Sequence, residues 1–334
     1  MKISVLGGGS WGTAIAKLLK YNEHDVEFYI RDEAVVNDVN TNNENSKYLP
    51  GVDLLGLKAT YNIYDAIKNA EAIVLGVPTN SIRGLLNQIK HEIDENVIIV
   101  NLAKGIEVET LYRVSEISEQ ILPNNVFVAL SGPSHAEEVG KNIPTAVTVS
   151  SKNHEIAKKI QHAFVSKYFR VYTNDDLIGV EISGALKNII ALAAGMSDGL
   201  GYGDNTKAAL ATRGIYEISK LGIKLGARLQ TFNGLAGIGD LIVTCTSMHS
   251  RNRRAGILIG KGISVKDVNA QIGQVVEGIK TTKSAYYLSK KHSISMPITE
   301  KLYEVIYENL DPKVAVNDLM TRTYKEEIEE IFLT

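Results

Sequence analysis

The sequence predicts an α/β fold in which an N-terminal, mostly parallel β-sheet is followed by a C-terminal all-helical domain. In the first half, short β-branched runs alternate with stretches long enough for crossover helices, a pattern typical of a parallel sheet covered on both faces. The remainder is rich in Ala, Gly and Leu at helical spacing and has almost no strand-like alternation. Because 334 residues exceed the usual size of one core, we expect two domains, at residues 1–175 and 176–334.

The expected strands share runs of β-branched and aromatic residues. In chain order they are KISVL (2–6), DVEFYI (25–30), EAIVLGV (71–77), NVIIVNL (96–102), NVFVAL (125–130), TAVTVS (145–150) and YFRVY (168–172). Crossover helices are expected between most of them.

The composition argues against several functions. A net charge of −2 does not favour binding to nucleic acid or to an anionic membrane. Cys245 is the single cysteine, and the seven histidines form no metal-binding motif, so we expect neither a disulfide nor a metal. Glycines interrupt the first apolar run, and no stretch approaches the roughly 20 apolar residues of a membrane span. We therefore expect a cytoplasmic protein without membrane insertion.

A glycine-rich turn follows the first expected strand. Gly7, Gly9 and Gly12 form a G-x-G-x-x-G pattern between a strand and a helix, which is the context of a Rossmann-like dinucleotide site. The first glycine would allow the tight turn, the second the approach of a pyrophosphate, and the third close packing of helix on strand. The helix N-terminus would attract the anion. We expect the ring of Trp11 to line the cofactor site.

The end of the second expected strand bears on the choice of cofactor. An acidic residue at this place would hold the ribose 2′-hydroxyl of NAD, but here the strand is expected to end in Arg31, followed by Asp32. An arginine suits the 2′-phosphate of NADP. The sequence thus favours NADP, with Asp32 as an argument for NAD. Tyr48 is either a flank of the same site or an ordinary loop tyrosine.

Residues 181–195, EISGALKNIIALAAG, read as a buried helix that contains Lys187 and then Asn188. A buried ammonium is costly unless it is paired or gives up its proton. None of its neighbours on the helix is a charge partner: they are Ser183, Gly184, Ile190 and Ala191. The small residues at 183–185 would leave room for a molecule to approach. The alternative is a lysine that extends its head group to the surface.

Several further motifs follow in order along the chain. They are NLAKGIE, LSGPSHAEEV, GVEISGALKNIIALAAG, GIGDLIVTCTSMHSRNRRAG and VVEGIKTT. Together with GGGSWGTAIA, they resemble the bacterial type of NAD(P)-dependent glycerol-3-phosphate dehydrogenase, and the resemblance runs from the first strand to about residue 320.

The resemblance implies an activity and a set of site residues. The reaction would be reversible hydride transfer between NAD(P)H and dihydroxyacetone phosphate, which gives sn-glycerol 3-phosphate for phospholipid synthesis. Lys187 would be the proton donor and acceptor. The implied substrate contacts are Lys104, Gly132, Ser134, Lys187, Asn188, Asp240, Thr244, Ser250, Arg251 and Asn252. The implied cofactor contacts are Gly7, Gly9, Ser10, Trp11, Gly12, Arg31, Tyr48, Lys104, Ala136, Arg251, Val275 and Glu277. A homodimer is a further expectation.

The chemistry of the residues agrees with these roles. Reduction of a ketone needs a proton on oxygen, and a lysine can supply it reversibly if burial and a second lysine lower its pKa. Asp240, if close, would oppose this shift and orient the ammonium. Arg251 with Asn252 offers a fork of donors for a phosphate. We interpret the neighbouring Arg253 and Arg254 as a solvated face.

Two alternatives fit part of the pattern. A 3-hydroxyacid or 6-phosphogluconate dehydrogenase would share the architecture and the lysine, but would fit LSGPSHAEEV and HSRN poorly. A sensor that binds NAD(P) without turnover would need no pair of lysines in a cleft.

Overall fold

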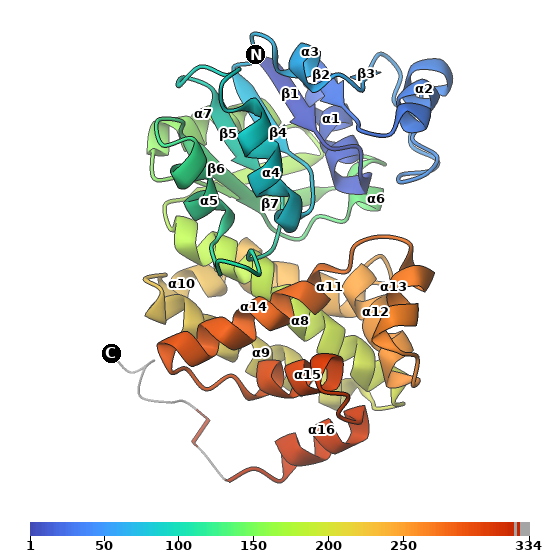
Figure 1. The fold of residues 1–334 in the computed structure, drawn as a ribbon, viewed down its shortest axis with the longest axis vertical. Coiled ribbons are helices and arrows are strands. Elements are labelled where there is room, and N and C mark those ends of the chain that lie inside the picture. The colour runs from blue at the N-terminus through green and yellow to red at the C-terminus, as the bar shows by residue number, and fades with distance from the viewer. Residues whose placement is uncertain (324–325, 328–334) are drawn as a thin grey trace.

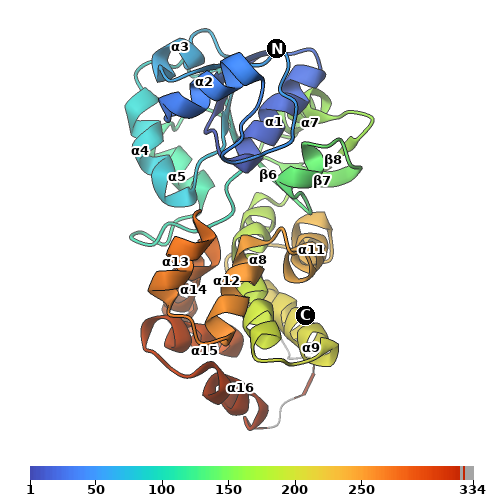
Figure 2. The same cartoon turned by 90° about the vertical axis from the view of Figure 1, so that its right-hand side faces the viewer.

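The computed structural model describes residues 1–323 and 326–327. It consists of an upper lobe built on a sheet and a lower lobe of helices (Figures 1 and 2). Residues of both lobes line one cleft. The expected α/β fold with a helical C-terminal lobe is confirmed. The chain passes from the last strand to the first long helix at residues 175–176, between Asn174 and Leu177. The division into two domains at this point stays a prediction, and the expected end at residue 334 lies outside the described residues.

The sheet has eight strands in the order β3-β2-β1-β4-β5-β6-β7-β8. They are β1 (Lys2–Leu6), β2 (Asp25–Tyr29), β3 (Lys58–Thr60), β4 (Ala72–Leu75), β5 (Ile98–Asn101), β6 (Phe127–Ser131), β7 (Thr145–Ser150) and β8 (Phe169–Asn174). All neighbours are parallel except β6 and β7. The strand β3 was not expected, because three residues at the sheet edge make no recognisable hydrophobic run.

Helices cover both faces of this sheet. They are α1 (Ser10–Tyr21), α2 (Glu33–Asn42), α3 (Ile63–Ile67), α4 (Thr79–Ile89), α5 (Val114–Ile121), α6 (Ala136–Val139) and α7 (His154–Phe164). Successive residues of the central strands belong to different cores: Val74 packs in one, and Ile73 and Leu75 pack in the other. This is why these strands read as continuous apolar runs. The strand order reverses beside β1, so a crevice opens at the carboxyl ends of β1 and β4.

The lower lobe is built around one long helix, α8 (Leu177–Gly199). Around it lie α9 (Asp204–Lys224), α10 (Leu229–Phe232), η1 (Leu235–Gly239, a π-type turn), α11 (Asp240–Thr246), α12 (Arg251–Gly260), α13 (Val265–Ile272), α14 (Glu277–His292), α15 (Pro297–Tyr307) and α16 (Pro312–Met320). Asp176 caps α8 by accepting a hydrogen bond from the Gly179 amide at 2.9 Å.

Glycines let α12 cross α8 with the two backbones in contact. A Cβ on Gly195 would lie 2.1 Å from the Arg253 carbonyl oxygen, and one on Gly256 would lie 2.1 Å from that of Leu192. The Ala- and Gly-rich composition of this half therefore serves helix packing.

By length and composition α8 could cross a membrane, although the sequence was expected to contain no such stretch. In the structure 89% of its most apolar window is buried by the other helices, so it is the core helix of this lobe. It is the single helix of this kind among the described residues.

Candidate active site between the two lobes

A cleft of about 870 Å³ separates the sheet from the helices, at the carboxyl ends of the first strands. Most of the residues that the sequence singled out line this cleft: Gly7, Gly9, Ser10, Trp11, Arg31, Tyr48, Lys104, Ser134, Ala136, Lys187, Asn188, Thr244, Ser250, Arg251, Asn252, Val275 and Glu277. Gly12, Gly132 and Asp240 lie behind its wall. One cleft thus collects side chains from both halves of the chain.

The glycine turn forms the upper end of the cleft. Gly7 has a φ of +127°, and a Cβ there would lie 2.5 Å from the Gly76 carbonyl oxygen. Around Gly9 the space is open within 4 Å, so an anion can approach the start of α1. A Cβ on Gly12 would lie 2.0 Å from the Gly7 carbonyl oxygen, so the helix packs directly on the turn. The buried Nε1 of Trp11 has no acceptor among the described residues. These features fit a dinucleotide.

Past the glycine turn, β2 ends at Tyr29, two residues earlier than Arg31. Arg31 is therefore an exposed loop residue, and its side chain lines the cleft. Asp32 is the N-cap of α2: it accepts from the Ala34 amide at 3.1 Å, and its second carboxylate oxygen lies 2.7 Å from Lys47 Nζ.

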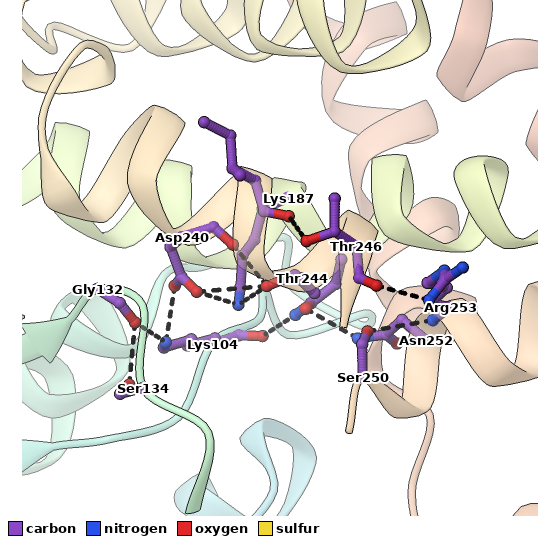
Figure 3. A network of polar contacts seen from close by, with 12 residues as sticks. Lys104, Gly132, Ser134, Lys187, Asp240, Thr244, Thr246, Ser250, Asn252 and Arg253 are labelled. Carbon is purple, nitrogen blue, oxygen red and sulfur yellow. Dashed lines mark hydrogen bonds and ion pairs between the residues drawn. The ribbon is translucent and has the colours of Figure 1, made fainter. Parts of the chain in front are cut away.

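The lysine of α8 lies at the lower end of the cleft, and it is not unpaired (Figure 3). Lys187 Nζ donates to Asp240 Oδ1 at 2.5 Å and to Thr244 Oγ1 at 2.6 Å, both on α11. From the sheet lobe, Lys104 Nζ donates to Asp240 Oδ2 at 2.7 Å and to the Gly132 carbonyl at 2.9 Å. Two ammonium groups therefore share one buried carboxylate. The sequence named Asp240 as a group that would orient this ammonium if it lay close, and the structure places it there, on another helix.

The electrostatics follow from this arrangement. Burial lowers the pKa of Lys187 from 10.5 to about 8; Asp240 opposes the shift and Lys104 adds to it. Burial pushes the pKa of Asp240 upward, but the two ammonium groups outweigh it, so this carboxyl titrates below its usual range. An ammonium with a pKa near 8 can both give and take a proton close to neutral pH.

The small residues before Lys187 do not open a path to the helix. A Cβ on Gly184 would lie 2.7 Å from Ser131 Oγ at the end of β6. Gly184 therefore allows α8 to pack against the sheet, and the expectation that residues 183–185 leave room for a ligand is wrong at this position.

Asn188 and Asn252 join three elements under the cleft. Asn188 donates to the Lys104 carbonyl at 3.1 Å and accepts from Asn252 Nδ2 at 2.9 Å. Asn252 Oδ1 accepts from the Gly278 amide at 2.8 Å. The Asn252 amide thus holds α8 and α14 in place, and does not project freely beside Arg251 as the expected fork would require.

The start of α12 presents the cationic groups. Ser250 caps the helix by accepting from the Arg253 amide at 3.2 Å. Arg251, half-buried, donates to Gln274 Oε1 at 3.0 Å, and burial lowers its pKa. Arg253 is not a solvated residue: its side chain is 13% exposed and donates to Asp198 at 2.7 Å and to the Thr246 carbonyl at 2.6 Å.

Arg254, the other arginine expected on a solvated face, is partly buried. Its Nε is buried and has no hydrogen-bond partner within the described chain. The side chain is therefore solvated only in part.

A glutamate connects the helical lobe to the sheet lobe. Glu277, the first residue of α14, accepts from the Thr79 amide at the start of α4 at 3.3 Å. Burial raises its pKa. Val275 is exposed beside it, and Ala136 opens α6 on the other side of the cleft.

Sequence reasoning missed other lining residues. Pro78 follows β4 in the turn GVPTN, which lies next to the glycine turn and lines the cleft with it. His135 and His249 come from the two lobes, and their rings lie 5.7 Å apart. Burial and the nearby Lys187 lower the pKa of His135. The sequence could have indicated that His135 lines the cleft, because it lies within the motif SGPSHAEEV. No motif marked Lys47 in the same way. The described residues include no group of three or more His, Cys, Asp or Glu able to hold a metal.

The sheet has this strand order and a glycine turn at its switch point, and the helical lobe brings a buried lysine to the same cleft; together these features define the class of dinucleotide-dependent dehydrogenases. Family comparisons narrow the class. Residues 2–157 match the N-terminal model, and residues 176–317 the C-terminal model, of NAD-dependent glycerol-3-phosphate dehydrogenase. The chain belongs to this family.

Similar proteins named glycerol-3-phosphate dehydrogenase (NAD(P)+) occur in several bacteria. One from Clostridium botulinum is 53% identical, over 98% of this chain and 99% of its own. One from Bacillus pumilus is 52% identical, over 99% and 97%. A crystal structure of glycerol-3-phosphate dehydrogenase from Coxiella burnetii superposes with a TM-score of 0.93 at 37% identity, over 96% of this chain and 99% of that one. A D-mandelate dehydrogenase, at 14% identity and a TM-score of 0.63, shares the fold alone.

Proposed function

We propose that this protein interconverts dihydroxyacetone phosphate and sn-glycerol 3-phosphate with NAD(P)H, and so supplies glycerol 3-phosphate for phospholipid synthesis. The observation that carries the proposal is the pair of lysines on one buried aspartate, in a cleft that also receives the glycine turn. The family named for this reaction gives independent support.

Lys187 is the proposed acid and base. The nicotinamide, when bound, supplies or accepts the hydride at the substrate carbon. Lys187 donates a hydrogen bond to the substrate oxygen, gives its proton as that oxygen becomes a hydroxyl, and takes the proton back in the reverse direction. Asp240 and Thr244 fix the direction of the ammonium, at 2.5 and 2.6 Å. Lys104 adds positive charge on the side of the sheet.

The phosphate end of the substrate is assigned to the start of α12. This end of the ten-residue helix points into the cleft with Ser250 and Arg251, so backbone amides and a guanidinium are available to an anion. Gln274, which also lines the cleft, accepts a hydrogen bond from Arg251 at 3.0 Å. Asn252 contributes by fixing the helix, through Asn188 and Gly278.

Arg31 supports a preference for NADP. It lies in the cleft directly after β2, where its guanidinium can meet a 2′-phosphate. Arg31→Ala is expected to weaken the binding of NADPH far more than the binding of NADH. Equal losses of affinity for the two cofactors would contradict this role.

The test is loss of nicotinamide absorbance when the purified protein receives NADPH and dihydroxyacetone phosphate. Turnover is expected with this substrate and not with 3-hydroxyacids or 6-phosphogluconate. Binding of NADPH without turnover of any of these compounds would instead support the sensor alternative. The variant Lys187→Met serves as the control, because it should bind NADPH and lack turnover.

The remaining expectations concern context. A homodimer, a cytoplasmic location and the absence of nucleic acid and membrane partners stay predictions. Light scattering on the eluted protein would test the first of these.

A further inference from the structure

Asp32 stands close to where an NAD-selective acid would stand, yet both of its oxygens are engaged. One accepts from the Ala34 amide at 3.1 Å and caps α2. The other accepts from Lys47 Nζ at 2.7 Å. Hydrogen bonding to Lys47 lowers the pKa of Asp32, so the carboxylate stays ionised and paired. A ribose 2′-hydroxyl that needs a free carboxylate oxygen therefore meets competition from Lys47.

The segment that carries Lys47 is anchored to the glycine turn. Asn45, fully buried, donates to the Gly8 carbonyl at 2.9 Å and to Thr13 Oγ1 at 2.8 Å. Ser46 is bound to Asp38 of α2 through its amide at 2.9 Å and its hydroxyl at 2.7 Å. These bonds fix the backbone directly before Lys47, on one side to the glycine turn and on the other to α2. Lys47 thus has a defined place beside the same turn that would receive the dinucleotide.

The charges at this rim favour an anion. Arg31 and Lys47 contribute two positive charges and Asp32 one negative charge, and all three line the cleft. A phosphate monoester carries roughly −1.5 to −2 charges near neutral pH, whereas a ribose hydroxyl carries none. The site as built therefore matches the phosphate better than the hydroxyl.

We propose that Lys47 is a specificity-determining residue for the cofactor: it occupies the Asp32 carboxylate, so that this acid does not hold a ribose 2′-hydroxyl, and its ammonium joins Arg31 in facing a 2′-phosphate. The inference rests on the proposed use of NAD(P)H, and it names the residue that sets the choice between the two forms. An exposed ion pair without this role would leave the choice unchanged.

The test measures binding of NADPH and NADH to the purified protein, without substrate, by calorimetry. Lys47→Gln is expected to weaken the binding of NADPH by about tenfold, as for loss of one charge-assisted contact. The affinity for NADH should stay the same or increase. In the double variant Lys47→Gln/Asp32→Asn, any gain for NADH should vanish, because no carboxylate remains to hold the hydroxyl. The matched control is Lys152→Gln, which removes an exposed lysine paired with Glu119 outside the cleft and should change neither affinity.

The proposal would be overturned if Lys47→Gln changed the affinities for NADPH and NADH equally, or changed neither. A gain for NADH that persists in the double variant would also overturn it, because the gain would then not come from Asp32. These outcomes are separate from the proposed reaction. Suppose that the protein does not reduce dihydroxyacetone phosphate, but that Lys47→Gln changes its preference between NADPH and NADH. The proposed reaction would then be refuted, and the proposed role of Lys47 would stand.

Discussion

Two lysine–aspartate pairs lie at the two ends of one cleft, and burial gives them opposite properties. In the pair at the lower end, Lys187 and Asp240 are 8% and 1% exposed, and burial lowers the pKa of the lysine to about 8. In the pair at the rim, Lys47 and Asp32 are 55% and 38% exposed, and the hydrogen bond to Asp32 raises the pKa of the lysine. The same two functional groups thus give a lysine that can exchange a proton near neutral pH in one place and a lysine that stays charged in the other.

Removal of the buried ammonium should have the largest effect. Lys187→Met is expected to lower kcat by something like 10² to 10⁴, the range for a positioned acid–base. Lys187→Arg should not restore it, because a guanidinium does not release a proton near neutral pH. The measurement is kcat for both variants. Their affinity for NADPH serves as a control that they are folded. Near-normal turnover in either variant would mean that Lys187 is a bystander.

The same variant tests the lowered pKa. Because Lys187 titrates near 8 in the fold and near 10.5 when unfolded, the unfolded chain binds more protons between these pH values. The free energy of unfolding should therefore rise with pH across this window, by up to about 3 kcal/mol, and the rise should be missing in Lys187→Met. Urea unfolding at several pH values measures it. Parallel curves for the two proteins would contradict the shift.

Asp240→Asn breaks the buried pair from the other side. Two ammonium groups then face each other, so the pKa of Lys187 should fall below 8. Reduction needs the protonated lysine, and its rate should therefore decline with rising pH earlier than in the wild type. We also expect a loss of about 3–5 kcal/mol in stability, as for other broken buried pairs. An unchanged pH profile would show that Asp240 does not tune the lysine.

An intermediate case sharpens the comparison. Arg253 and Asp198 are 13% and 16% exposed, and Arg253 also donates to the Thr246 carbonyl, near the end of α12 that is proposed to bind the substrate phosphate. Arg253→Met should cost about 1–3 kcal/mol and raise KM for dihydroxyacetone phosphate. The matched control is Lys207→Gln, which removes another partner of Asp198, 2.9 Å away, without touching Thr246. If both variants raise KM equally, the contact between Arg253 and the Thr246 carbonyl is not the cause.

The smallest effect on stability is expected at the rim. Lys47→Gln should leave the melting temperature unchanged within error, because exposed ion pairs contribute little. A clear drop in melting temperature would mean that Lys47 is mainly structural, and that the contrast between the two pairs is weaker than their exposure suggests.

Local patterns were sufficient to predict the fold and part of the site. The strands, the change to helices after β8 and the glycine turn all depend on neighbouring residues, and seven of the eight strands followed from them. Residues such as Lys187 and Arg251 were identified by their motifs. Their location in one cleft was visible only once the chain had folded.

Contacts between distant segments were not predictable in the same way. The partner of Lys187 lies 53 residues away, and the aspartate that Lys104 shares lies 136 residues away. Gly184 was taken as an opening because nothing in its sequence shows that β6 packs against it. Arg253 was taken as solvated because Asp198 comes from another helix. The proposed role of Lys47 depends on Asn45, which ties its segment to the glycine turn.

The bond between Lys104 and Asp240 crosses from the sheet lobe to the helical lobe, and this links proton affinity to the relative position of the lobes. If this bond were broken, Asp240 would attract Lys187 alone, and the pKa of Lys187 would then be higher. By reciprocity, protonation of Lys187 would weaken the hold of Asp240 on Lys104 by the same free energy.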